Sequence, residues 1–175
     1  MPMVITITLL LCSLMIYIIY HDFRFRTLPV SILVFTLIIV ILRSVVINSW
    51  YNALFFAAIN ILILTVQYIF LTIYFSLRNK KLISILNSYI GSGDIWFYGA
   101  LTFCFSPLNF VLFNALSCFI VIAVYIFQKN KSTIPLAGFL ALFLLITVGL
   151  NYSFRISMFY QDSFLLSGIS YFNNS

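Results

Sequence analysis

Two aspartates stand at the edges of long apolar segments, and they are the residues of this sequence best suited to chemistry. The 175-residue chain has only three acidic residues, and all of them are Asp. Asp22 ends one apolar run, and Asp94 begins another, directly behind two glycines in GSGD. An Asp held toward the centre of a membrane costs about 2.5 to 3.5 kcal/mol on insertion scales, so retaining two of them in such a chain indicates a function.

A pair of carboxylates can perform acid–base chemistry if the fold brings the two side chains together. At about 4 Å and an effective dielectric near 20, two ionised carboxylates repel by roughly 4 kcal/mol, so the pair shares one proton. Aspartic proteases use a carboxylate pair of this kind. The ionised member deprotonates a water that attacks a peptide carbonyl, and the protonated member hydrogen-bonds the carbonyl oxygen. Because the titration belongs to the pair, the sequence assigns neither residue as the acid or the base.

The glycines of GSGD have two interpretations. Gly91 and Gly93 permit backbone angles that are closed to other residues, and they let a substrate strand approach the main chain without a Cβ in the way. The free N–H groups at the start of the following helix favour the ionised form of Asp94. Taken alone, GSGD is also typical of an ordinary turn with an N-cap Asp.

Composition places these residues in a membrane. Hydrophobic residues make up 64% of the chain and charged residues 7%, with a mean hydropathy of +1.18, which is far outside the range of a soluble domain. Lipid offers the backbone no hydrogen-bond partners, so helical spans follow. We therefore expect an all-α polytopic membrane protein that forms a single integral membrane domain over residues 1–175.

Apolar stretches predict a bundle of about six transmembrane helices, because each must cross roughly 30 Å of hydrocarbon. The predicted spans are 3–20, 30–48, 52–77, 94–106, 109–127 and 134–150. The fourth is short, roughly 20 Å at the helical rise. Arg43 interrupts the second span near its outer end, from where its side chain can snorkel outward. Residues 82–90 are interpreted as an interfacial helix or an extension of the third span.

The basic residues predict the topology. Seven of the nine lie in alternate breaks between the spans, in HDFRFRTLP, RNKK and QKNKST, whereas the other breaks carry no charge. By the positive-inside rule these breaks are cytoplasmic, and both termini and the tail 151–175 lie outside. The same rule explains the net charge without nucleic acid. Asp22 and Asp94 then lie on the cytoplasmic side at a similar depth.

Two motifs together resemble the type IV prepilin peptidases, which are membrane GxGD aspartyl proteases. In DFRFRTLP, basic residues follow the first Asp, and Leu28 and Pro29 hold the spacing of the family's Ile-Pro. GSGD supplies the second Asp. IPLAGFLA, residues 134–141, is similar to the start of the family's last helix. The resemblance covers about residues 10–150, with Val30 and Trp96 where the family usually has Asn and Lys.

The resemblance implies an activity. Asp22 and Asp94 would be the catalytic residues of an aspartic endopeptidase that removes the short basic leader of prepilin-like precursors, pilins or pseudopilins, for type IV pili or protein secretion. Cleavage would take place at the cytoplasmic face of the cell (inner) membrane. The chain resembles the short, peptidase-only form, because the CxxC-containing methyltransferase segment of larger members is not present in it. Its partners would be prepilin-like substrates and membrane lipid, not nucleic acid, and no metal or organic cofactor is expected.

Residues around the two aspartates receive secondary roles. Gly91, Gly93, Arg24, Arg26 and Pro29 are candidates for binding substrate or shaping the site. The two arginines either hold a substrate carbonyl or carboxylate or act as topology signals and lipid contacts, and Pro29 is expected to start the second helix.

Two other residue types favour structural interpretations. His21, beside Asp22, either tunes that carboxylate or is structural. Cys12, Cys104 and Cys118 lie inside apolar runs without CxxC spacing, so packing is expected for them rather than a zinc site or a disulfide.

Two alternative functions fit the composition. A transporter or channel subunit could use two intramembrane aspartates to relay protons or to bind a cation, but no pair of broken helices recurs in the two halves of the sequence. A non-catalytic component of a pilus or secretion machine is the second alternative. Retention of both aspartates favours the peptidase.

Overall fold

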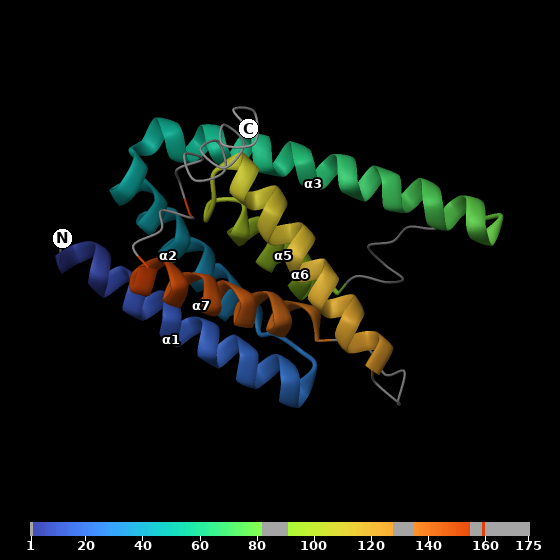
Figure 1. Ribbon diagram of the computed structural model, residues 1–175, viewed down its shortest axis with the longest axis horizontal. Coiled ribbons are helices and arrows are strands. Elements are labelled where there is room, and N and C mark those ends of the chain that lie inside the picture. Colours follow the sequence, from blue (N-terminus) through green and yellow to red (C-terminus); the bar gives the residue numbers. More distant parts are fainter. Residues whose placement is uncertain (1, 82–90, 128–134, 155–158, 160–175) are drawn as a thin grey trace, which may run out of the picture.

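The computed structural model describes residues 2–81, 91–127, 135–154 and 159, and over these ranges its regular elements are helices. Figure 1 shows their arrangement. The helices are α1 (Pro2–Phe25), α2 (Val30–Asn48), α3 (Trp50–Asn79), α5 (Ser92–Leu101), α6 (Pro107–Phe127) and α7 (Leu136–Phe154). The predicted all-α fold is confirmed.

Four helices are long and apolar enough to cross a membrane: α1, α2, α3 and, over Pro107–Val124, α6. Length and composition thus define a multi-pass membrane protein. The predicted fourth span is α5, which is shorter than expected: it has 10 residues and measures about 15 Å, half of the hydrocarbon thickness. The sixth predicted span is α7, whose apolar part is Leu136–Tyr152.

The early end of α5 has a physical cause in a buried amide. Asn60 of α3 is fully buried, and its Nδ2 donates to the carbonyl oxygens of Thr102, at 2.8 Å, and Phe105, at 2.9 Å. Backbone carbonyls that leave a helix inside an apolar bundle need a donor, because lipid provides none. Asn60 supplies it, so the chain can turn after Leu101 instead of continuing as a span.

A tight turn joins α1 to α2 and fixes the position of Asp22. Arg26 adopts a left-handed φ of 56°, and its N–H donates to the carbonyl oxygen of Asp22 at 3.1 Å. Pro29 directly precedes Val30, the first residue of α2, in agreement with the expectation that it starts this helix. Asp22 therefore lies in the last turn of α1.

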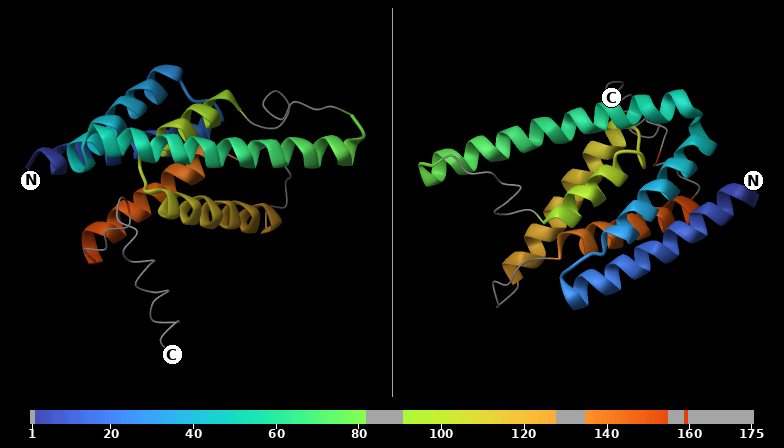
Figure 2. Two further views of the ribbon diagram at one scale, coloured as in Figure 1. Left: turned by 90° about the horizontal axis from the view of Figure 1, so that it is seen from above. Right: turned by 180° about the vertical axis from the view of Figure 1, so that it is seen from behind.

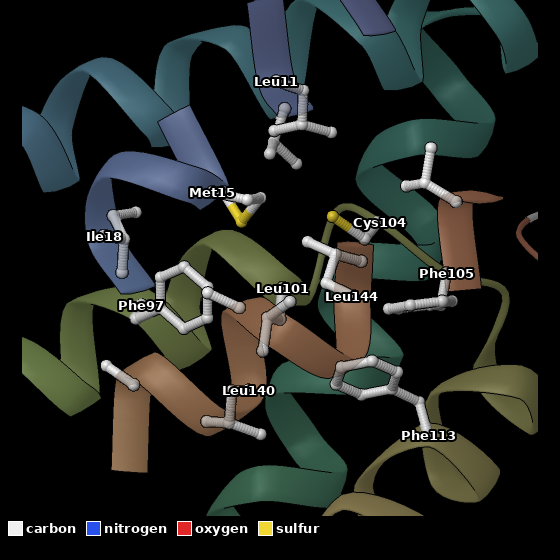
Figure 3. Close-up of a cluster of buried hydrophobic side chains, with 14 of the residues drawn as sticks. Leu11, Met15, Ile18, Phe97, Leu101, Cys104, Phe105, Phe113, Leu140 and Leu144 are labelled. Atoms are coloured by element: carbon white, nitrogen blue, oxygen red, sulfur yellow. The ribbon is translucent and has the colours of Figure 1, made fainter. Parts of the chain in front are cut away.

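The core forms where α1, α5 and α7 meet. α1 packs against α7 and α2, and α2 packs in turn against α5 and α3; the right-hand view of Figure 2 shows α7 alongside α1. Figure 3 shows the buried side chains that fill the centre, among them Leu11, Met15, Ile18, Phe97, Leu101, Leu140 and Leu144. Those of α1 recur at helical spacing and so form one face. This packing holds the C-terminal end of α1 beside the first turns of α5 and α7.

Arg43 lies inside the bundle, which corrects the expectation that it snorkels outward. Its side chain is 4% exposed. The guanidinium carbon lies 4.5 Å from the centre of the Phe159 ring, and Nε donates to Thr8 Oγ1 at 3.4 Å. Phe159 stacks in turn on Phe105, with ring centres 5.1 Å apart. A face-on ring attracts a desolvated cation, so Arg43 is stabilised without reaching the surface.

The predicted outward-facing tail, 151–175, begins inside a helix and contributes to the core. α7 continues to Phe154, and Phe159 is buried at 2% exposure. The rest of the tail, with Asp162, lies outside the described residues, and so does the interfacial segment 82–90.

Candidate active site

Asp22 and Asp94 meet at the first turn of α7. Asp94 Oδ1 accepts a hydrogen bond from the N–H of Ala137 at 3.0 Å, and Asp22 Oδ2 accepts one from the N–H of Gly138 at 2.6 Å. These N–H groups belong to consecutive residues, whose Cα atoms are about 3.8 Å apart. The two carboxylates, which the sequence separates by 72 positions (94 − 22), therefore lie side by side.

The start of α7 is built to receive negative charge. The first N–H groups of a helix have no partner within it, and the helix dipole is positive at this end. The first turn of α7 has no acidic residue of its own, and Pro135 directly before it lacks an N–H. The carboxylates of α1 and α5 therefore take the place of a local cap. Figure 1 shows the beginning of α7 beside the end of α1 and the start of α5.

A cavity of about 650 Å³ opens onto both carboxylates. Its volume is in the range of small-molecule and cofactor sites. The residues that line it come from the α1–α2 turn, from GSGD and from the facing parts of α6 and α7: Asp22, Arg26, Thr27, Leu28, Gly91, Ser92, Gly93, Asp94, Val121, Pro135 and Leu136. Within the described ranges, no group of three or more His, Cys, Asp or Glu side chains could hold a metal ion.

The environment of Asp94 disfavours its ionisation. Asp94 lies in α5, outside the four long helices. Burial raises the pKa of its carboxyl above the ordinary value of 3.8, and the negative charge of Asp22 raises it further, while the N–H groups of Ala137 and Gly91 oppose the rise. Like charges at short range share a proton. A raised pKa at Asp94 is the direction that a shared proton requires.

Gly91 and Gly93 provide space near the pair rather than an unusual backbone. Gly91 has a φ of −68°, and no glycine in the described part of the chain has a positive φ, which corrects the expectation of special backbone angles. A Cβ on Gly91 would lie 3.2 Å from Asp94 Oδ2, and one on Gly93 would lie 3.4 Å from the Cβ of Leu28. A Cβ at either position would therefore crowd its neighbours, and the main chain of Gly91, Ser92 and Gly93 borders the cavity.

The two arginines of the first motif occupy different positions. Arg26 lines the cavity, and its positive charge lies close enough to act on Asp22. Arg24 is exposed and is not among the lining residues. Its guanidinium carbon lies 5.6 Å from the ring centre of Tyr20 and 5.4 Å from that of Phe25. Only Arg26 is brought to the site.

Pro29 and His21 support the turn that carries Leu28 to the cavity. Pro29 is not among the lining residues. The Nδ1 of His21 hydrogen-bonds the carbonyl oxygen of Thr27, and its ring stacks on that of Tyr17 and lies tilted against that of Phe25. These contacts give His21 a structural role, and its charge also acts on Asp22.

Sequence reasoning did not identify Ala137 and Gly138 as partners of the two carboxylates. The available signal was PLAG in residues 135–138, a Pro directly before a helix with a Gly at its third position. The resemblance connects this segment only with the start of the family's last helix. Backbone N–H donors carry no side-chain signature, so the pattern alone could not reveal what they bind.

Fold and site together define a polytopic helical membrane protein with paired carboxylates beside a cavity at one end of the bundle. Residues 9–127, more than half of the chain, match the type IV leader peptidase family. The chain therefore belongs to this family and is a peptidase, which confirms the resemblance to prepilin peptidases. The matched part contains both aspartates and ends before α7. No curated protein and no solved structure matches the chain.

Proposed function

We propose that this peptidase is an aspartic endopeptidase with Asp22 and Asp94 as its catalytic pair, and that it removes the leader of prepilin-like precursors at the cytoplasmic face of the cell membrane. One observation carries the proposal: both carboxylates lie on consecutive N–H groups of α7, at the wall of one cavity. Membership of the leader peptidase family supplies the substrate class.

The chemistry follows from a pair that holds one proton. The ionised carboxylate takes a proton from a water, whose oxygen adds to the carbonyl carbon of the scissile bond. The protonated carboxylic acid stabilises the developing oxyanion by a hydrogen bond. Collapse of the tetrahedral intermediate breaks the C–N bond, and the amine leaves with a proton from the pair. The products are the leader's carboxylate and the new N-terminus, and the pair returns to its starting charge.

The lining of the cavity suits a peptide segment. Gly91, Ser92 and Gly93 border the cavity, and the first N–H groups of a helix have no partner within it, so those of α5 can donate to substrate carbonyls. Leu28, Val121 and Leu136 add apolar side chains to the lining. An extended cleavage segment would therefore bind beside the pair, with the hydrophobic helix of the precursor continuing into the membrane.

The distribution of charge supports the cytoplasmic face. The site lies at the C-terminal end of α1, which carries Arg24 and is followed by Arg26. The C-terminal end of α3, with Arg78, Lys80 and Lys81 at or after its last turn, points to the same side of the bundle (Figure 1). Basic residues mark cytoplasmic ends. The active site would then meet a leader peptide on the side where precursors are synthesised.

The test is co-expression with candidate prepilins from neighbouring genes, followed by N-terminal sequencing of the product. The wild type is expected to trim a leader at the edge of the hydrophobic helix, whereas Asp22→Asn and Asp94→Asn are expected to trim none. Asp162→Asn is the matched control, because it makes the same chemical change at the third acid, and it should retain processing. Substantial cleavage by either of the first two variants, at wild-type membrane levels, would contradict the paired mechanism.

A further inference from the structure

Gly138 differs from the other described glycines in what surrounds it. It is the third residue of α7, and its N–H donates to Asp22 Oδ2 at 2.6 Å. A Cβ at this position would lie 2.8 Å from both Cδ2 and Cε2 of Phe23 and 3.1 Å from the Asp22 oxygen. The first distance is shorter than Cβ contacts in real proteins, and the second is shorter than nearly all of them. Only glycine fits without moving the Phe23 ring and pressing on the Asp22 carboxylate.

The remaining space around Gly138 is closed by α1 itself. The Phe23 ring packs edge-on against Phe139, with ring centres 5.0 Å apart, and Asp22 is 6% exposed. A Cβ at residue 138 would press on the Phe23 ring and on Asp22 Oδ2, the oxygen that accepts from the N–H of residue 138. By contrast, a Cβ on Gly149, in the same helix, would meet nothing within 4 Å.

We propose that Gly138 is a positioning residue for catalysis, because the absence of its side chain lets one helix N-terminus hold both carboxylates of the pair at once. This inference rests on the proposed function and deepens it. Asp94 reaches the N–H of Ala137 from α5, and Asp22 reaches the next N–H from α1. The separation of the carboxylates is then set by the main chain of α7 rather than by either helix that carries them.

The arrangement fixes charge as well as distance. Backbone N–H donors favour the ionised form of the carboxylate that accepts from them. The N–H groups of α7 therefore stabilise the one negative charge that the pair needs to deprotonate water. Among the described residues, Arg26 and His21 are charged or titratable groups that act on Asp22, and the charge of Asp94 acts in turn on Tyr98. α7 contributes no charged side chain over Leu136–Phe154. Lengthening the hydrogen bond from one of these N–H groups to its carboxylate should therefore move the acidic limb of the pH–rate profile to higher pH.

The experiment compares Gly138→Ala with Gly149→Ala as purified full-length proteins in detergent, on a synthetic prepilin-like peptide. For Gly138→Ala, kcat should fall about 10- to 100-fold, the range for a lost hydrogen bond to a charged group, with KM nearly unchanged. The acidic limb of kcat/KM against pH should move to higher pH. Gly149→Ala should match the wild type in both, since its Cβ enters open space.

A second pair of variants separates catalytic positioning from packing. Phe23→Ala removes the ring that a Cβ at residue 138 would strike, so Phe23→Ala/Gly138→Ala should fold even if Gly138→Ala does not. The contact with Asp22 remains in the double variant. Its kcat should therefore stay about tenfold or more below that of Phe23→Ala alone, by the same loss of a charged hydrogen bond, with the same shift of the acidic limb.

Two outcomes would overturn the inference. Either Gly138→Ala behaves like Gly149→Ala, or the double variant recovers the kcat and pH profile of Phe23→Ala, in which case the glycine only makes room for a ring. Both differ from a failure of the proposed function, which would appear as full activity in Asp22→Asn or Asp94→Asn.

Discussion

The bundle buries charge in two regions, and they are built differently. At one end, Asp22 and Asp94 face a cavity and accept hydrogen bonds from the backbone of α7. Elsewhere in the bundle, Arg43 is enclosed by Thr8 and the Phe159 ring, and it does not line that cavity. Both regions place charge in an apolar chain, where it is costly. Only the first combines buried charge with space for another molecule.

This difference shows that a buried charge is not by itself a functional site. Burying the charge of Arg43 costs free energy, as burying the aspartates does, yet the neighbours of Arg43 pack tightly around it. The aspartates form a pair whose hydrogen-bond donors are backbone N–H groups at a helix N-terminus, and the pair borders an open cavity. The comparison predicts that variants in the first region change catalysis, and that variants in the second change stability.

The largest expected effect is on catalysis at the pair. Asp22→Asn and Asp94→Asn should each lower kcat/KM by about 10² to 10⁴-fold, the range for general acid–base groups, because an amide cannot exchange the proton. Assays with a prepilin-like peptide in detergent would measure this. A loss smaller than tenfold in either variant would remove the distinction between the two regions.

A large effect on stability is expected at Arg43. Arg43→Ala should lower the free energy of unfolding by about 2 to 5 kcal/mol, as for other large-to-small changes in a core, and leave the kcat/KM of the folded protein within about threefold. Denaturation in detergent measures the first quantity. Arg43→Met is the matched control: it keeps the volume, and replacing a buried charge by an apolar group of similar size is often neutral or stabilising. Loss of activity in folded Arg43→Met would contradict a purely structural role.

A moderate effect is expected from filling the space beside Asp94. Gly91→Ala would place a Cβ 3.2 Å from Asp94 Oδ2, so we expect kcat to fall by about tenfold, less than for complete loss of the carboxylate. Gly99→Ala is the control in the same helix, since its Cβ would meet nothing within 4 Å. Equal activities of the two variants would show that the carboxylate tolerates the displacement.

The smallest expected effect is a pH-dependent gain in stability. Burial and the charge of Asp22 raise the pKa of Asp94 above 3.8 in the folded protein, so the folded state binds more protons than the unfolded state between 3.8 and the raised value. Stability therefore falls as pH rises through this window and stays lower above it. Asp94→Asn removes this cost. Its melting temperature should exceed that of the wild type at pH 7, and the difference should vanish below pH 3.8.

Thermal scans of both proteins at the two pH values would measure this effect. Leu101→Ala, a buried apolar change in the same helix, should lower the melting temperature by a similar amount at both. A wild type that is more stable than Asp94→Asn at pH 7 would show that the folded state favours the ionised carboxyl.

Much of the fold could be predicted because it depends on local properties. Apolar length located α1, α2, α3 and α6 to within a few residues, since lipid forces each apolar stretch into a helix. The end of α5 could not be predicted, because it depends on Asn60, which reaches from α3 to carbonyls more than 40 positions away. The burial of Arg43 depends likewise on a ring 116 positions later in the chain (159 − 43).

The sequence by itself determined that this is a helical membrane protein, that two aspartates are its unusual residues and that they stand in the motifs of the leader peptidases, because composition, apolar length and short-range spacing are written along the chain. Only the tertiary structure decided that the carboxylates meet, that α7 holds them through two consecutive N–H groups and that Gly138 makes room for the contact. Backbone donors are the same at every residue except proline, so only the folded bundle determines which N–H groups the carboxylates reach.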